Sequence, residues 1–551
     1  MPAYPDLDAL RVVVDASMAD GDTSGARHSM YGVVHQIALE DGARFREFVT
    51  GLPELLWHGD PVITSALGSS YRCAGSPPGA AALAYFRAAE SAITMSAEPV
   101  PPTCIVAVLT AHAAALRTQG RLMDAEAKLV EAGRLLEEAA HTPSFVQHSA
   151  RFALEYGVVD LLLGRLESAR RRLEYAHGLA ADHLTRSEQV ECLGSLALAA
   201  YSQGDLITTD RMIAAVQAAE PPHNVMQSGF ASAYYAAQIL VVTDRYNVAE
   251  LPEIVTRMVT ASAHTEWEPF AAVVGAYARG LQGDPIESLD LLHRAHQSYM
   301  KWQPPGIGLD IGDLLRADIL GMLDRGDEAF DILSGLNPHE RHALCPERFM
   351  ARIALQHGDL RGADLALGDC ELLGEAHSPR TLIDVQLLRA AIEMERGNLS
   401  SSDLGFDRAL HAMARTGVRS PFRHIPPALL ARLTERALQR SQSDESRRIL
   451  ARVAEATDGQ VDDRQALSER ERLVLFHVQR KLTVAQIAGE LFISPNTVKT
   501  HLRRLYRKLG VATREEAIRK ARSLGLHLGP PSDITRQSPA LRDDRGDDPV
   551  I

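Results

Sequence analysis

The C-terminal architecture can be derived from residues 467–525, which read LSERERLVLFHVQRKLTVAQIAGELFISPNTVKTHLRRLYRKLGVATREEAIRKARSLG. At the start of a helix, a hydroxyl or amide side chain satisfies backbone N–H groups that the helix leaves unpaired. Four such signals occur here, and three of them are reciprocal capping boxes. They are Ser468 with Glu471, Thr483 with Gln486, Ser494 with Pro495, and Thr513 with Glu516. The sequence therefore predicts four short helices, the third of which ends at Gly510.

The third predicted helix has an apolar face and a basic face. The apolar residues that recur at helical spacing and are expected to face a core are Val498, Leu502, Leu505 and Leu509. The other side carries Asn496, Lys499, Thr500, Arg503 and Arg507. On an average helix such a face is merely solvated. Here a short apolar helix (484–491) and a tight connection precede it, which indicates a helix-turn-helix whose second helix enters the DNA major groove.

The charge distribution supports a nucleic-acid interface at this end of the chain. Residues 464–528 contain 14 lysines and arginines against 5 aspartates and glutamates, so their net charge is +9. The whole chain of 551 residues carries −13, and residues 1–463 alone carry −20. A basic domain attached to an acidic body is typical of a protein that binds a duplex through one part only.

Residues 467–517 resemble the C-terminal DNA-binding domain of LuxR-type transcription regulators. The matching motifs are Leu467-Ser468, Arg470-Glu471, Ile487-Ala488, Leu491, Ser494-x-x-Thr497-Val498-Lys499-x-His501, Lys508-Leu509-Gly510-Val511, Arg514 and Ala517. Two positions depart from the family pattern. Glu469 stands where the family usually has proline, and Lys481 stands where it usually has glycine between the first two helices.

The resemblance implies a role for each residue of the basic face. Lys499, Thr500 and Arg503 are expected to contact base edges, since arginine and lysine can donate to guanine and a threonine methyl can meet a thymine methyl. The expected phosphate contacts are Thr483, Ser494, Thr497, Arg504, Arg507 and Lys508. The fourth helix, 513–523, usually pairs two such domains, so a homodimer on a two-fold site is expected.

Residues 103–456 contain a repeating pair of helices joined by a glycine turn. The turns are at Gly120-Arg121, Gly164-Arg165, Gly204-Asp205, Gly283-Asp284, Gly326-Asp327, Gly358-Asp359 and Gly397-Asn398, with Asp244-Arg245 as a degenerate member. Glycine supplies the left-handed conformation that ends the first helix of each pair. A period near 40 residues predicts an α-solenoid, and it resembles the tetratricopeptide-like repeats of MalT-type regulators.

The remaining segments complete the predicted domain organisation. Residues 1–102 form an N-terminal helical region that could contain the first units of the solenoid, and the solenoid extends over 103–456. A polar, glycine-containing linker is expected at 457–463, and the DNA-binding domain at 464–528. Residues 529–551 show almost no apolar periodicity and are expected to be disordered.

Several chemical functions have no sequence signal. There is no Gly-x-x-x-x-Gly-Lys phosphate loop, so no ATPase domain is expected, and the first lysine is Lys128, which argues against a phospho-receiver domain before the solenoid. No catalytic constellation or cofactor motif is seen, so we expect no enzyme activity and no cofactor. Five scattered cysteines predict buried thiols in a reducing cytoplasm and no metal site. No apolar run reaches the length of a membrane span.

These observations predict an all-α protein, an α-solenoid of helical hairpins followed by a small four-helix DNA-binding domain. The function expected is sequence-specific transcription regulation, with double-stranded DNA and RNA polymerase as partners and a small-molecule or protein effector at the solenoid. The solenoid can also be interpreted as a spacer or a dimerisation scaffold. The alternative function is a scaffold or adaptor protein that uses its C-terminal helices for dimerisation.

Overall fold

The computed structural model contains only helices in the residues that it describes, which confirms the all-α prediction. These residues are 7–72, 80–96, 99–138, 145–300, 306–323, 325–336, 344–373, 378–440, 443–451, 453, 469–491, 493–509, 511 and 513–523. The predicted linker at 457–463 and the predicted disordered tail at 529–551 lie outside them. The chain divides into two compact units, Met1–Leu450 and Ala451–Ile551.

The first unit begins with a cluster of short helices around its own hydrophobic core. Its core residues come from α1 to α6 and include Leu10, Met30, Phe45, Leu56 and Leu67. The helices are α1 (Leu7–Ala19), α2 (Thr23–Tyr31), α3 (Val34–Glu40), α4 (Gly42–Gly51), α5 (Glu54–Trp57) and α6 (Pro61–Ser69), and the longer α7 (Ala80–Met95) follows them.

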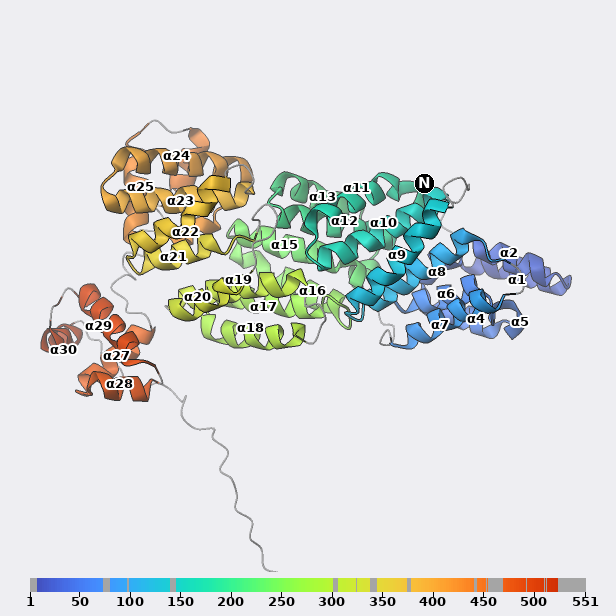
Figure 1. Cartoon of the computed structure of the whole chain (residues 1–551), viewed down its shortest axis with the longest axis horizontal. Helices are drawn as coiled ribbons and strands as arrows, with labels where there is room; N and C mark the ends of the chain where they lie inside the picture. The colour runs from blue at the N-terminus through green and yellow to red at the C-terminus, as the bar shows by residue number, and fades with distance from the viewer. Residues whose placement is uncertain are drawn as a thin grey trace, which may run out of the picture. The chain divides into compact units, whose positions relative to one another are not determined.

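Consecutive helical hairpins form the rest of the first unit, and each lies beside the next in the stack (Figure 1). Their first and second helices are α8 (Pro102–Arg117) with α9 (Leu122–Glu138), α10 (Phe145–Leu162) with α11 (Leu166–His183), α12 (Arg186–Ser202) with α13 (Leu206–Ala218), α15 (Ser232–Asp244) with α16 (Leu251–Ser262), α17 (Glu268–Leu281) with α18 (Pro285–Tyr299), α19 (Ile307–Met322) with α20 (Gly326–Ser334), α21 (Glu347–Gln356) with α22 (Leu360–Leu373), and α23 (Pro379–Arg396) with α24 (Leu399–Thr416). The 3-10 helix η6 (Ser420–His424) and α25 (Pro427–Leu438) follow.

The glycine turns account for the shape of the hairpins. Six of the seven predicted turn glycines have a positive φ, between 73° and 109°. Where aspartate follows, it caps the second helix: Oδ1 of Asp205 accepts from the N–H of Thr208 at 3.1 Å. A Gly-Asp pair therefore ends one helix and begins the next.

Two turns differ from this scheme. The prediction that Gly326 ends a helix is wrong, because Gly326 is the first residue of α20. At the degenerate turn it is Tyr246, two residues after Asp244, that takes the left-handed conformation with φ of 61°. A non-glycine residue in that conformation is strained, and the hairpin tolerates it at this point.

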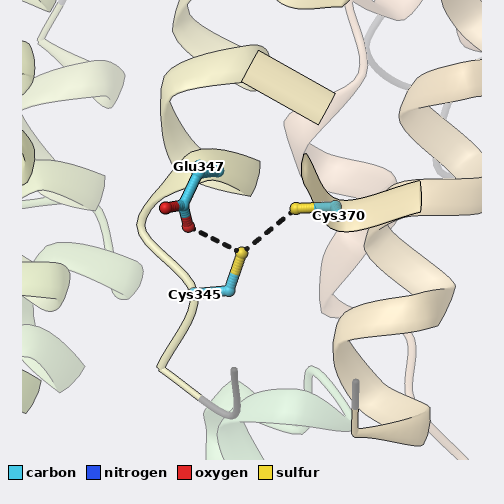
Figure 2. A group of neighbouring side chains, drawn as sticks. All are labelled: Cys345, Glu347 and Cys370. Atoms are coloured by element: carbon cyan, nitrogen blue, oxygen red, sulfur yellow. Dashed lines mark hydrogen bonds between the residues drawn. The ribbon is translucent and has the colours of Figure 1, made fainter. Parts of the chain in front are cut away.

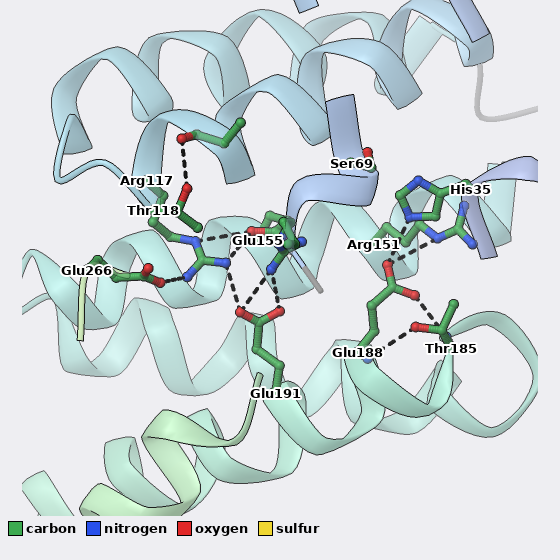
Figure 3. Close-up of polar contacts among 12 residues, drawn as sticks. His35, Ser69, Arg117, Thr118, Arg151, Glu155, Thr185, Glu188, Glu191 and Glu266 are labelled. Carbon is green, nitrogen blue, oxygen red and sulfur yellow. Dashed lines mark hydrogen bonds and ion pairs between the residues drawn. The ribbon is translucent and has the colours of Figure 1, made fainter. Parts of the chain in front are cut away.

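A buried network of charges links successive hairpins of the helical repeat (Figure 3). The Arg117 side chain on α8 is fully buried and pairs with Glu155 of α10, with Glu191 of α12 and with Glu266, which precedes α17. Arg72 pairs with the first two of these glutamates. A buried charge is tolerated only with such partners, so the network fixes how these helices meet.

Candidate nucleic-acid interface

The second unit is built from short helices that the capping signals start. In its described part four helices follow one another, α27 (Glu469–Gln479), α28 (Val484–Glu490), α29 (Pro495–Leu509) and α30 (Arg514–Ser523). The Thr483 box is formed as predicted, with the Thr483 N–H donating to Gln486 Oε1 at 2.8 Å. At α30 the Glu516 N–H donates to Thr513 Oγ1 at 3.2 Å. Ser468 and Gly510 lie outside the described residues.

The N-terminus of α29 is held by two hydroxyl side chains. The Thr497 N–H donates to Ser494 Oγ at 3.1 Å, and the two hydroxyls share a second hydrogen bond of 2.8 Å. Pro495 occupies the first helical position, where a missing N–H has no cost. The local sequence therefore sets where α29 begins and leaves exposed hydroxyls beside a helix N-terminus, which favours anions.

The apolar face of α29 packs as the periodicity predicts. Val498, Leu505 and Leu509 are buried, and Leu502 packs partly buried against the same core. The other buried members of this core are Val474, Leu475, Val478, Ile487, Ala488 and Ala517. Helices α27, α28 and α30 therefore hold α29 by one face and fix its orientation within the unit.

The opposite face of α29 carries exposed, positively charged side chains. Lys499, Arg503 and Arg507 are exposed, and none of them forms an ion pair with a residue that the structure describes. The Thr500 hydroxyl donates to the Asn496 carbonyl at 3.1 Å, so its methyl is the part that remains for another contact. Two of the three predicted base-contacting residues are thus exposed on one face with Arg507.

The other two predicted phosphate contacts of α29 lie in different surroundings. The Lys508 Nζ lies 2.6 Å from Oε2 of Glu471, whose side chain is only 3% exposed. Arg504 is partly buried, and this burial, with Arg507 nearby, lowers its pKa. The structure therefore brings Lys508 towards α27 and gives it a partner within the domain.

Two further arginines have structural roles that the sequence did not indicate. Arg470 of α27 donates to the Leu491 carbonyl at the end of α28, at 3.1 Å. Arg514 of α30 donates to the carbonyls of Val478 and Leu482. These bonds connect residues more than 20 positions apart, so only a three-dimensional structure reveals the acceptors. They secure the helix-turn-helix against the outer helices.

The connection between α27 and α28 contains Lys481, which stands where the LuxR-type pattern usually has glycine. Lys481 is exposed and has a φ of 61°, a conformation in which glycine is favoured. The chain therefore makes the same left-handed turn that glycine would make, at some cost in strain.

One group of residues in the first unit has metal-ligand chemistry. The Sγ atoms of Cys345 and Cys370 lie 3.4 Å apart, and the Cys345 thiol donates to Glu347 Oε2 at 3.2 Å (Figure 2). Thiolates and carboxylates are the ligand types that zinc accepts. The sequence predicts scattered thiols and no metal site, because 25 residues separate the two cysteines and no motif spacing links them.

A sequence family matches the second unit. The model of the bacterial regulatory proteins of the LuxR family matches residues 465–521, which confirms the resemblance of the C-terminal domain. The match covers the whole helix-turn-helix and the flanking α27 and most of α30. No described helix is both long enough and apolar enough to span a membrane.

Curated relatives match part of the chain. The transcriptional regulator MalT of Serratia proteamaculans is 46% identical over 63 residues, 11% of this chain and 7% of that protein. A probable transcriptional regulatory protein NarL of Mycobacterium tuberculosis is 49% identical over 55 residues, 10% of this chain and 26% of that protein. MalT of Klebsiella pneumoniae is 29% identical over 209 residues, 33% of this chain and 23% of that protein. The chain spans about a quarter or less of the length of these relatives.

Among solved structures, the hetero-tetramer of Cut9 and Hcn1 from the APC/C is similar at 12% identity. The alignment covers 94% of this chain and 97% of that chain, with a TM-score of 0.37.

Proposed function

Because residues 465–521 form a LuxR-family helix-turn-helix domain, we propose that the chain is a sequence-specific, DNA-binding transcription regulator. The observation that carries this proposal is the exposed face of α29. Lys499 and Arg503 stand there without ion pairs to described residues, while the opposite face is packed in the core. A helix held in this way can enter a major groove without rearranging the domain.

Each residue of this face receives a role in the complex. Arg503 and Lys499 donate to guanine O6 and N7, and the Thr500 methyl contacts a thymine methyl. Phosphate oxygens are bound by Thr483, Ser494, Thr497, Arg504 and Arg507, at helix starts and along the flank of α29. Lys508 was expected to join them, but its ion pair with Glu471 supports a structural role instead.

Dimerisation and effector binding are assigned to other parts of the chain. Helix α30 pairs two C-terminal domains, so a homodimer reads two half-sites about one helical turn apart. The helical repeat receives a small-molecule or protein effector, and the DNA-bound dimer acts on RNA polymerase in the cytoplasm. The relatives support transcription regulation as the output, since both MalT and NarL are transcription regulators by name.

The test is selection of bound sequences from a random duplex pool by the full chain, at about physiological salt. A two-fold motif is expected. In Arg503→Ala, binding should weaken by about 1–3 kcal/mol and preference at one base pair of each half-site should relax. Arg503→Lys is the matched control: it keeps the charge and should keep the salt dependence, but it loses bidentate geometry and hence the base preference.

Two results would contradict the proposal. One is that the full chain binds DNA without any sequence preference, both in the absence of cell extract and when extract is added as a source of effector. The other is an Arg503→Ala variant that selects the same motif with the same affinity. Either result, with an unchanged oligomeric state, would favour the scaffold interpretation.

A further inference from the structure

A cavity of about 70 Å³ lies inside the helical repeat, between hairpins that are far apart in sequence. Its lining residues come from an earlier part of the repeat, α12, α15, α17 and α19, and from a later part, α21, α23 and η6. The polar residues that line it include Tyr201, Tyr277, Arg348, Arg380, Asp384 and Arg423. Three arginines around one small volume is an unusual concentration of buried positive charge.

The carboxylates at this cavity are already occupied by neighbouring groups. Oδ2 of Asp244 accepts from the Tyr201 hydroxyl at 2.8 Å and from Arg380 at 3.2 Å. Arg348 pairs with Asp384. Asp318, which does not line the cavity, pairs with both Arg352 and Arg423. Among the described residues, four arginines thus share these three aspartates.

A histidine of η6 also lines the cavity. His424 lies beside Asp384 and Asp318. Its pKa is nevertheless lowered to about 4, first by burial and then by Arg352 and Arg423. The imidazole is therefore neutral at neutral pH and offers a polar group, not a charge, to the cavity.

Several buried donors on the cavity wall have no hydrogen-bond acceptor among the described residues. They are Nε of Arg348, Nε of Arg423, and the hydroxyls of Ser202 and Thr243. Arg348 forms a single hydrogen bond to the described residues, through Nη1, so its Nη2 is also without a partner there. Native interiors leave few polar groups unsatisfied, and a cluster of them around one cavity indicates an absent acceptor.

We propose that this cavity binds the oxyanion group of a small ligand, a phosphate or a carboxylate, and that this ligand is the effector of the helical repeat. A volume of about 70 Å³ holds one such group, and its oxygens can accept from the donors of Arg348, Arg423 and Thr243 that have no acceptor among the described residues. The planar guanidinium of Arg348 matches two oxyanion oxygens at once. A ligand that contacts residues of both parts would tie η6 and α21 to the earlier hairpins. Only the regulatory consequence depends on the proposed function, and the binding itself is measured without DNA.

The experiment is thermal unfolding of the full chain titrated with inorganic phosphate or with acetate, against chloride at equal ionic strength. A saturable rise in unfolding temperature is expected with at least one oxyanion and not with chloride, since a ligand of the folded state stabilises it by mass action. Arg348→Met should raise the apparent dissociation constant at least tenfold. Arg432→Met removes an exposed arginine paired with Glu395 and should not change it.

A second variant keeps the test decisive if Arg348→Met does not fold. Ile311→Phe adds bulk to the cavity wall without changing any charge and should also abolish the saturable response. The proposal is overturned if neither oxyanion gives saturation up to tens of millimolar. It is equally overturned if Ile311→Phe, or a folded Arg348→Met, responds like the native chain. DNA binding could still be intact in either case, because that property resides in α29.

Discussion

Adjacent residues of α29, Arg507 and Lys508, provide a direct test of the assignments on this helix. Both carry a positive charge and both match phosphate-contacting positions, yet only Lys508 is paired with a buried carboxylate, that of Glu471. Arg507 is exposed and has no ion pair among the described residues. We therefore predict that Lys508→Met lowers stability and that Arg507→Met lowers DNA affinity.

The expected magnitudes follow from the burial of each group. Breaking a fully buried ion pair costs about 3–5 kcal/mol. The Lys508 side chain is 36% exposed, so water weakens the pair, and we expect a loss of about 1–3 kcal/mol in local stability. For Arg507→Met the change in stability should stay within about 0.5 kcal/mol. Removing Arg507 from both subunits of a dimer should reduce the slope of log affinity against log salt by about two.

Two assays on the full chain separate these effects. Native-state hydrogen exchange on peptides from α27 and α29 reports local stability, and fluorescence anisotropy with the selected duplex at several salt concentrations reports the slope. The reasoning is refuted if Lys508→Met reduces the salt slope as much as Arg507→Met does while exchange protection of α27 stays native. Lys508 would then be a phosphate ligand, and its ion pair with Glu471 would have no structural role.

Other predictions concern stability. Lys481→Gly should stabilise the second unit by about 0.5–1 kcal/mol in hydrogen exchange, because φ is 61° at this position. Arg117→Met should cost about 3–5 kcal/mol in thermal or urea unfolding of the first unit, since three buried glutamates lose a shared partner. Burial already raises the pKa of Glu266, and Arg117 opposes that rise. The variant's folded state therefore binds protons more readily, so its deficit should be largest at neutral pH and shrink as the pH falls into the acid range. Gly194→Ala should cost about 1–3 kcal/mol by the same unfolding measurement, because its Cβ would lie 2.6 Å from the Tyr234 backbone nitrogen.

Features encoded over a few residues could be predicted from the sequence. The capping boxes of Thr483 and Thr513 each depend on a partner three positions ahead, and both are formed. Six turn glycines were predicted correctly for the same reason. Gly326 was misplaced because a glycine followed by an acidic residue can also begin a helix, and the turn pattern does not distinguish the two cases.

Features that join distant segments could not be predicted. The pair formed by Lys508 and Glu471 spans 37 residues, and the contact of Arg117 with Glu266 spans 149. Arginine at such positions has the same local pattern as a solvated surface arginine, so burial and partner become visible only when the helices are packed. The cavity that Arg348 and Arg423 line could not be predicted for the same reason, since its lining residues come from separate parts of the repeat.

The separation of a packed face and an exposed face on α29 also has an evolutionary consequence. Val498, Leu505 and Leu509 hold the helix, whereas Lys499 and Arg503 on the other face form no ion pairs within the described part of the domain. Mutations at the two exposed positions can accumulate without destabilising the fold. If α29 reads bases as proposed, two copies that arise by gene duplication could therefore diverge in operator preference without a loss of fold stability.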